Sequence, residues 1–452
     1  MVADEGAWVE HYKGLVDAAT GTLGPEEWSG SWGRGTTGSC KDVAKACSDG
    51  RSGPALVFGV VLNLTRTIVG SGVLCLPFAL QEGGAGLGVL ALAATAGLSL
   101  VGFLAIGHAC VATGARSYGE AWRLTVGTAP LVVDVMIFFE CLITCVGYVI
   151  LILDYLGKGL QGIAGLPVTV GMRARLAGTI TMSILIPLCL RPRLDSLKFS
   201  SLLGNVAMLY TISYVILDCA LCGRRTGLVE DVIFVGTDSD GVFRSTCVMT
   251  SAYVAHYSAP AFLDELSAHP RRWRGFRVAA AASFGISLLA YGLFAVAGYE
   301  RFGSEVLGNV LLNYESSLCV FLAWMSMAAT LTVSFPLIFK PARDTLAEVL
   351  VLTPNLEQSR AGGARLACPW ALMTVLAVVG TVLPGILLRD ISWVLALRGA
   401  VLGCPISFIL PGLMLLHCPQ NKSWLRKKLS AWLLIVFGSL AGAMGFYCTF
   451  NS

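Results

Sequence analysis

The chain has 452 residues, of which 55% are apolar and only 13% are charged. Soluble domains carry about 25% charged residues, so the composition excludes an ordinary soluble protein and indicates a chain that lies mainly in a lipid bilayer. The formal net charge of +4 is small and gives no reason to expect a nucleic-acid partner.

The first fifty residues differ in kind from the rest. They are polar, rich in Gly and Ser, and contain Trp8, Trp28 and Trp32. A segment with so few apolar residues cannot bury enough surface to fold, so we predict a disordered cytoplasmic tail over residues 1–50. The alternative is that its tryptophans rest on the membrane surface. No cleaved signal peptide is expected, because no apolar run lies near the start.

Eleven later stretches are long and apolar enough to cross a membrane. A spanning helix needs about 20 mostly apolar residues. The stretches are 54–80, 85–112, 129–157, 174–190, 199–221, 243–265, 276–300, 314–340, 367–388, 391–416 and 429–450. We therefore predict an all-α polytopic membrane protein, with one transmembrane domain over residues 51–452.

The basic residues predict how these segments are oriented. If the N-terminus is cytoplasmic, 22 of the 32 Lys and Arg residues lie in cytoplasmic segments and eight lie on the opposite side. The other two, Arg66 and Arg398, fall within spans. Cytoplasmic connections of membrane proteins are enriched in Lys and Arg. We therefore expect a cytoplasmic N-terminus and, with eleven spans, a C-terminus on the opposite side.

The first predicted span carries Arg66 and the sequence Gly70-Ser71-Gly72 near its middle. An exposed backbone N–H or C=O is costly in hydrocarbon, so non-helical backbone at this depth must face protein or a watery cavity. Broken helices of this kind hold the central site of many secondary transporters. The run therefore predicts a solute carrier. The alternative is that the two glycines only allow close helix packing.

The third predicted span contains a second charge, Glu140, at a similar depth. Glu140, Thr144 and Gly147 share one helical face, which we expect to point into the bundle. A charge at the bilayer centre costs about 2.5–3.5 kcal/mol and usually has a partner. We hypothesise that Arg66 and Glu140 form an ion pair beside the site. The alternatives are a purely structural pair, or separate partners.

Two other charges in spans are interpreted as structural. Asp218 joins Thr211 and Tyr214 in a polar stripe of the fifth span, near its outer end. Arg398, in the tenth span, is expected to reach the outer surface or Asp390.

Four blocks of sequence occur in a fixed order along these spans. They are Asn63 to Leu80, with GSG before Pro77; Ser251 to Pro260, followed by Asp264-Glu265-Leu266; Gly298 to Gly303; and Ser334 to Leu337 with Pro341 to Arg343, joined by Ser407 to Pro411. Over residues 54–450 the chain resembles the amino acid/auxin permease family, which includes the neutral amino acid transporters of systems A and N. Each block alone is weak evidence for this resemblance, whereas the four blocks in this order are specific to the family.

The resemblance implies a leucine-transporter-type inverted repeat of five plus five spans, in which spans 1 and 6 are interrupted at the substrate. The sequence permits this, because residues 70–72 and 256–260 lie in the first span of each half. The N-terminus of a half-helix carries unpaired N–H groups and a partial positive charge. We expect the N–H groups of Ser71, Gly72 and Val73, next to Gly70, to bind a substrate α-carboxylate.

The resemblance also implies side chains in the sixth and eighth spans. Tyr253 and His256 are expected to close over the substrate; the alternative for His256 is a bracing contact with backbone beside the break. An ion-binding hydroxyl is implied in the eighth span, where Thr330 and Ser334 are candidates. The alternative is that each bonds back to a carbonyl one turn earlier.

The resemblance also bears on the ion that drives transport. Family members driven by sodium use backbone and hydroxyl oxygens near this depth, and Arg66 is expected to replace the metal ion as a fixed positive charge. Transport would then be sodium-independent, and Glu140 would exchange protons or act as counter-ion to a cationic amino-acid side chain. H+ and Na+ both remain open as the coupling ion.

The predicted function is secondary active transport of amino acids by alternating access, in the plasma membrane or in a vacuolar or lysosomal membrane. The alternative is an amino-acid-sensing receptor that shares the site. An enzyme is not expected, because the five histidines form no i, i+4 pair. The fifteen cysteines lack metal-ligand spacing, so we expect no metal or cofactor. The expected partners are the amino acid and the lipid bilayer, and no obligate protein partner is evident.

Overall fold

The computed structural model of the chain describes residues 53–129, 131–165, 168–191, 198–223, 239–349, 367–418 and 424–451. The predicted cytoplasmic tail, residues 1–50, lies outside these ranges. Within them all regular secondary structure is helical, as predicted for an all-α membrane protein.

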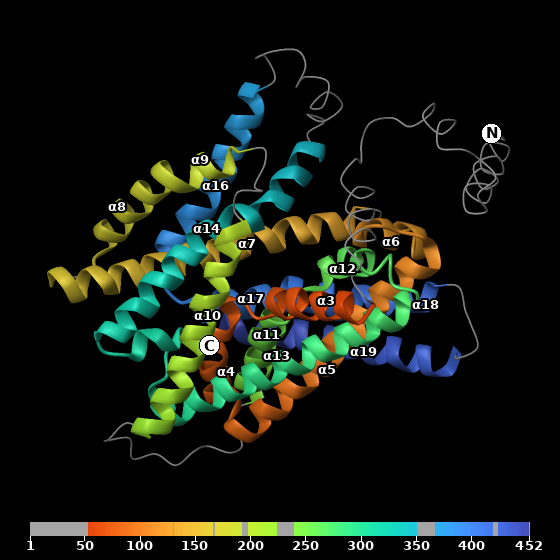
Figure 1. Cartoon of the computed structure of the whole chain (residues 1–452), viewed down its shortest axis with the longest axis horizontal. Helices are drawn as coiled ribbons and strands as arrows, with labels where there is room; N and C mark the ends of the chain where they lie inside the picture. Colours follow the sequence, from red (N-terminus) through yellow and green to blue (C-terminus); the bar gives the residue numbers. More distant parts are fainter. Residues whose placement is uncertain are drawn as a thin grey trace. The chain divides into compact units, whose positions relative to one another are not determined.

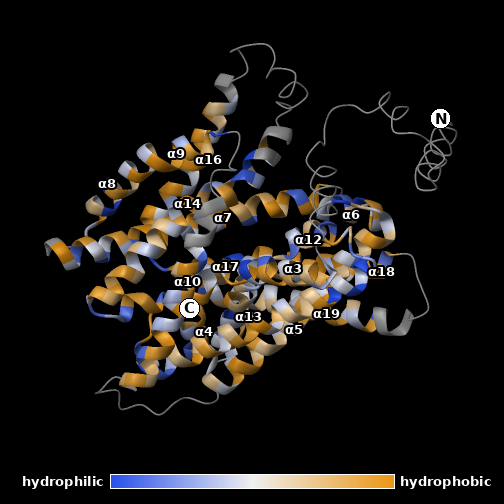
Figure 2. Ribbon diagram, in the orientation of Figure 1, coloured by the Kyte–Doolittle hydropathy of each residue, from blue (hydrophilic) through white to orange (hydrophobic). Residues whose placement is uncertain are grey.

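Nine segments of the described ranges are long and apolar enough to cross a membrane. They are α5 (Ala85–Thr113), α7 (Val132–Ala164), α8 to α9 (Val170–Cys189), α10 (Lys198–Cys222), α13 (Arg272–Phe302), α14 (Leu318–Val349), α16 (Ala367–Leu387), α17 to α18 (Ile391–His417) and α19 (Trp424–Asn451). Each coincides with a stretch predicted from composition. Apolar residues predominate along these helices (Figure 2), and large apolar side chains are exposed, as lipid contact requires: Leu289 and Leu293 of α13 are 68% and 60% exposed.

The first predicted span is interrupted, as expected. It consists of α3 (Gly53–Ile68), the 3-10 helix η1 (Ser71–Cys75) and α4 (Leu76–Gly83), and the two halves meet at a bend of 46°. Pro77 lies in the first turn of α4, where the missing N–H removes no helical hydrogen bond. The proline therefore fits the start of the second half-helix and not the interior of a continuous one.

The sixth predicted span has the same construction. It consists of α11 (Ser239–Ala252), the 3-10 helix η4 (His256–Ser258) and α12 (Ala259–Glu265), with Pro260 in the first turn of α12. Neither helix alone reaches the length of a span. The predicted total of eleven is therefore met only if α3–α4 and α11–α12 each count as one interrupted span beside the nine.

The remaining short elements lie in connections or within spans. Connections contain α6 (Tyr118–Thr125), η5 (Gly303–Glu305) and η6 (Val310–Asn313). π-Helical turns interrupt α8–α9 at η2 (Thr181–Leu185) and α17–α18 at η7 (Gly399–Gly403) and η8 (Pro405–Ile409), leaving α8 (Val170–Ile180), α9 (Ile186–Cys189), α17 (Ile391–Arg398) and α18 (Leu410–His417). Such turns often mark functional positions, and Arg398 directly precedes one of them.

Two groups of helices can be followed in Figure 1. In the first, the interrupted spans α3–α4 and α11–α12 pack with α5 and α13. In the second, α7 packs along α14 and against α16, which in turn contacts α8. The largest cluster of buried apolar side chains draws on both interrupted spans, α5, α7 and α13, so the breaks lie in the packed interior and not at the lipid surface.

Candidate functional site

The break in the first span leaves backbone donors unpaired. Gly70 is extended, with φ −117° and ψ −164°, and η1 begins at the next residue. The N–H of Val73 donates to the carbonyl oxygen of Gly70 at 3.2 Å, whereas the N–H groups of Ser71 and Gly72 have no backbone acceptor in the described chain. The predicted set of three free donors is therefore corrected to two, because Val73 is already the first bonded residue of the 3-10 turn.

The two breaks contact each other directly. A Cβ at Gly72 would lie 3.0 Å from the Cα of Ala252, the last residue of α11. Gly72 therefore lies in the interrupted part of the first span and also allows close packing of that span on α11.

A cavity of about 410 Å³ lies beside this break. Its walls come from α3, α7, α10, α12 and α14 and from the break between α11 and α12. The lining residues are Asn63, Arg66, Thr67, Val69, Gly70, Ser71, Tyr148, Gly204, Asn205, Met208, Tyr257, Phe262, Glu265, Met327, Thr330, Leu331, Ser334, Leu337 and Ile338. Five predicted site residues are among them: Arg66, Gly70, Ser71, Thr330 and Ser334. The cavity therefore combines one residue with a free backbone N–H, Ser71, with one positive and one negative side chain and an apolar wall.

Five other predicted residues do not line this cavity: Gly72, Val73, Tyr253, His256 and Glu140. Gly72 adjoins it through the chain, and Val73 is fully buried behind the break.

His256 points away from the cavity into the helix bundle. The residue is fully buried, its Nε2 lies 3.0 Å from the carbonyl oxygen of Ser99 in α5, and its Nδ1 lies 3.0 Å from Oγ of Ser407 in η8. Both ring nitrogens are thus engaged by neighbouring helices. His256 does not line the cavity in this structure, and the bracing alternative describes its contacts.

Tyr253 is also buried in packing. Its ring stacks on Phe284 and meets Tyr291 edge-on, with centroids 6.2 and 5.0 Å apart, and both partners belong to α13. Its hydroxyl has no hydrogen-bond partner in the described chain. Tyr253 therefore packs the second break against α13 and does not line the cavity in this structure.

Glu140 pairs with Arg398 and not with Arg66. The Glu140 Oε1 lies 2.5 Å from Nη2 and 2.7 Å from Nε of Arg398, and the two side chains are 1% and 11% exposed. This corrects two predictions, the Arg66–Glu140 pair and the assignment of Arg398 to Asp390 or the surface. Asp390 instead caps α17, where its Oδ1 accepts from the Ser392 N–H at 2.8 Å.

Arg66 lies on the open face of its helix. The packed face of α3 is formed by Val60, Val61, Leu64 and Ile68. Arg66 is two residues from both Leu64 and Ile68, so its side chain must point to the opposite side, where it is exposed and lines the cavity. No ion pair to Arg66 is found in the described chain.

Tyr148 and Tyr257 were missed by the sequence reasoning. Both line the cavity together with Ser71 of the break. Tyr148 continues the i, i+4 series of Glu140 and Thr144, and Tyr257 follows His256 directly, so a signal for each was present in the sequence. A small second cavity lined by Ser71, Tyr148 and Arg398 joins the break to the buried ion pair.

Hydroxyls on α14 differ in their bonding. Thr332 donates to the carbonyl oxygen of Ala328 at 2.7 Å, the back-bonded arrangement considered for this helix. The Oγ1 of Thr330 has no partner in the described chain and is buried, although the residue lines the cavity. The Thr330 hydroxyl therefore has no bonding partner in the described chain, whereas the Thr332 hydroxyl already donates its proton.

Ion pairs close the other end of the described bundle. Arg244 of α11 lies 2.9 Å from Glu82 of α4, and Arg301 of α13 lies 2.7 Å from Asp218 of α10. The cavity instead meets α10 near its start, at residues 204–208. It is therefore confined to the side of the breaks that holds α3 and α12. Asp218, predicted to be structural, is paired.

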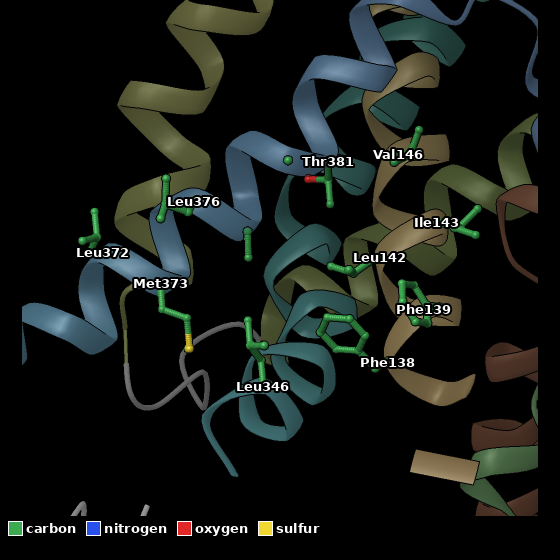
Figure 3. Close-up of a pocket in the computed structure, with 12 residues that line it drawn as sticks. Phe138, Phe139, Leu142, Ile143, Val146, Leu346, Leu372, Met373, Leu376 and Thr381 are labelled. Carbon is green, nitrogen blue, oxygen red and sulfur yellow. The ribbon is translucent and has the colours of Figure 1, made fainter. Parts of the chain in front are cut away.

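A larger cavity, of about 710 Å³, has a different character. It lies between α7, α14 and α16, where Figure 3 shows Phe138 and Phe139 near Leu346 and Met373. Thr381 provides the one polar side chain of its lining. A zwitterion has no counter-charge there, so the smaller cavity is the candidate site.

Comparison with protein families gives a match over nearly the whole chain. The family described as "Transmembrane amino acid transporter protein" matches residues 54–451. Vacuolar amino acid transporter 5 of Schizosaccharomyces pombe is 26% identical over 369 residues, which cover 81% of this chain and 85% of that protein. Putative sodium-coupled neutral amino acid transporter 10 of Xenopus laevis is 24% identical; the match covers 79% of this chain but only 34% of the relative, so the chain spans about a third of its length.

A solved structure has the same architecture. The structure of MhsT in complex with L-phenylalanine aligns with a TM-score of 0.53 at 13% identity, covering 87% of this chain and 98% of that one. At this identity the likeness shows the fold alone. It confirms the predicted leucine-transporter-type fold of a multi-pass membrane protein.

Proposed function

Because the chain belongs to the transmembrane amino acid transporter family, we propose that it carries an amino acid across the membrane by alternating access, without sodium and with a proton. The prediction of a transporter and not an enzyme is confirmed by this membership. The observation that carries the proposal is the pair of free N–H groups at Ser71 and Gly72, at a break beside a cavity of about 410 Å³ that Ser71 lines.

The substrate α-carboxylate binds at the start of the Ser71–Gly83 half of the first span. Free N–H groups and the positive end of the helix dipole both favour an anion there. Tyr148 and Tyr257 add hydroxyl groups beside the break. The substrate side chain then extends between α10 and α14, along Met208, Met327 and Leu331.

Alternating access is supported by the one-sided cavity. Substrate reaches the break between α3, α12 and α14, while the Arg244–Glu82 and Arg301–Asp218 pairs hold the opposite side closed. Transport requires these pairs to separate as the first group of helices rocks against the second. The basic residues support a cytoplasmic position for the cavity side.

Sodium independence is supported by Arg66. Its guanidinium group lines the same cavity as Thr330 and Ser334. A fixed positive charge there repels a metal cation and neutralises the same carbonyl and hydroxyl oxygens that a cation would. The name of the Xenopus laevis relative describes sodium coupling. The coupling ion that we propose for this chain therefore differs from the one in that name.

Proton coupling is supported by Glu140. One carboxylate oxygen is held by Arg398, and the other, Oε2, is buried without a partner in the described chain. A carboxyl group with an unfilled acceptor beside the substrate break is placed to take up a proton.

We further propose that the protein resides in an internal, vacuole-like membrane. The support for this location is the name of the fission yeast relative, a vacuolar amino acid transporter.

Counterflow in proteoliposomes tests the proposal. Purified protein is reconstituted with one unlabelled amino acid inside, and uptake of the labelled amino acid is followed with choline chloride in place of NaCl. We expect accumulation above that of protein-free liposomes, and faster net uptake with an inward proton gradient. Saturable binding without any flux would contradict transport and favour a sensor.

A further inference from the structure

One buried side chain touches both interrupted helices. Tyr291 of α13 is fully buried, and its hydroxyl oxygen lies 2.6 Å from the carbonyl oxygen of Ile68 and 3.0 Å from that of Ala252. Ile68 is the last residue of α3, and Ala252 is the last residue of α11. The hydroxyl therefore lies between the ends of two half-helices that are far apart in the sequence.

Both acceptors carry partial negative charge. The last carbonyls of a helix lack N–H partners and form the negative end of its dipole. Two such ends that converge repel each other, and in broken-helix transporters exposed carbonyls of this kind bind a cation. Here the Tyr291 hydroxyl puts a proton between them instead.

The two carbonyls differ in what else they bind. Ile68 also accepts from the Gly70 N–H at 2.8 Å, whereas Ala252 has no second donor in the described chain. Removing the hydroxyl thus leaves the Ala252 carbonyl buried and unpaired. The Tyr291 ring itself is held edge-on against Tyr253, at 5.0 Å between centroids, so the position of the hydroxyl is fixed by packing.

We propose that Tyr291 is a positioning residue that ties the two breaks together through its one hydroxyl proton, in place of a bound cation. The inference rests on the proposed transport function, because its effect is to hold the Ser71 and Gly72 donors in place while the two half-helices move as one unit. No contact between Tyr291 and the substrate is required.

The test compares three purified full-length variants. Tyr291→Phe removes only the shared hydroxyl. Ser283→Ala removes another hydroxyl contact between α13 and α3, the 3.1 Å bond to the Val61 carbonyl, which lies away from the breaks. Tyr253→Phe makes the same chemical change on the neighbouring ring, whose hydroxyl is unpartnered.

Hydrogen–deuterium exchange is measured at residues 68–73 and 252–256, with counterflow as the second readout. For Tyr291→Phe we expect exchange at both breaks to rise at least about tenfold and counterflow to fall by a similar factor. Both control variants are expected to stay within about twofold. Exchange of the parent protein is expected to be equal in NaCl and choline chloride.

Several results would overturn the inference. One is an exchange rate in Tyr291→Phe equal to that in Ser283→Ala. Another is a faster exchange rate at only one of the two breaks, and a third is slowing of exchange by sodium in the parent protein.

If Tyr291→Phe does not fold, fluorotyrosine at position 291 provides the test, because it is a stronger hydrogen-bond donor of nearly the same shape. Slower exchange supports the tether, and unchanged exchange refutes it. A parent without counterflow contradicts the transport proposal alone, since exchange still reports on the tether.

Discussion

Glu140 and Arg398 show how a buried charge in this fold finds its partner. Depth in the membrane favoured Arg66 as the partner of Glu140, and Arg398 was expected to reach the outer surface or Asp390. The apolar face of α3 turns Arg66 toward the cavity, whereas Arg398, at the end of α17, is brought within 2.5 Å of the carboxylate. Side-chain direction on the helix, and not depth, decided the pair.

Neutralising Glu140 is expected to impair both stability and coupling. Glu140→Gln leaves the Arg398 guanidinium buried without a counter-charge, and breaking a buried pair costs about 3–5 kcal/mol. We expect a lower melting temperature in detergent and loss of the stimulation of uptake by an inward proton gradient.

Asp134→Asn is the matched control on the same helix. Its pair with Arg123 is 3.2 Å long, with side chains 33% and 45% exposed, so the change should cost no more than about 1 kcal/mol. A Glu140→Gln protein that keeps the melting temperature and pH response of the parent contradicts both roles of the carboxylate.

Arg66 provides a separate prediction at this scale. We expect the parent to transport equally well in NaCl and in choline chloride, and Arg66→Ala to lose at least about tenfold in uptake because the cavity loses its positive charge. The exposed Arg116, in the connection after α5, supplies Arg116→Ala as a control. Uptake by the parent that requires sodium would refute the surrogate-cation role.

At the scale of elements, glycine and proline residues in the sequence favour the interruptions of the spans. Glycine at positions 70 and 72 weakens the first helix, and Pro77 suits the start of the next half-helix. In the second half the same position is taken by Pro260 in the first turn of α12. The breaks then stabilise each other, because Gly72 packs on the end of α11.

Gly72→Ala is expected to separate the breaks. Its Cβ would lie 3.0 Å from a backbone atom of Ala252, which cannot move aside as a flexible side chain does. We expect uptake to fall several-fold. The same change at Gly97 in α5, where no atom lies within 4 Å, should be neutral or stabilise the helix by up to about 1 kcal/mol. Equal activity of the two variants would contradict contact between the breaks.

At the scale of the whole molecule, the number of spans depends on α11 and α12. If this pair crosses the membrane, three spans separate the segment 224–238 from the segment 350–366, and the two lie on opposite sides. If it does not cross, they lie on the same side. With eleven spans and the cytoplasmic N-terminus that the basic residues predict, we expect 224–238 on the outer or luminal side.

Glycosylation mapping decides between these topologies. We expect an N-glycosylation acceptor inserted at 224–238 to be modified in cells, and one inserted at 350–366 to remain unmodified. The natural acceptor Asn421-Lys422-Ser423 serves as the internal control and should also remain unmodified, because it follows the tenth span. Modification at both inserted positions would show that α11–α12 does not span.

Composition and the positions of Gly, Pro and basic residues determined the helical membrane class, the segments, the first break and the orientation that we predict. These features are local: a helix of sufficient length must satisfy its own backbone in lipid, and a weak point in it is visible residue by residue. The placement of Arg66, Gly70, Ser71, Thr330 and Ser334 around one cavity also follows from sequence patterns together with the resemblance.

Only the tertiary structure decided which side chains meet across helices. It assigned Arg398 to Glu140, turned His256 and Tyr253 into the bundle, added Tyr148 and Tyr257 to the cavity, and placed the Tyr291 hydroxyl between the ends of α3 and α11. The physical reason is that such contacts depend on helix rotation and on the packing of distant segments. Periodicity within one segment fixes which residues share a face, but not which neighbouring helix that face will touch.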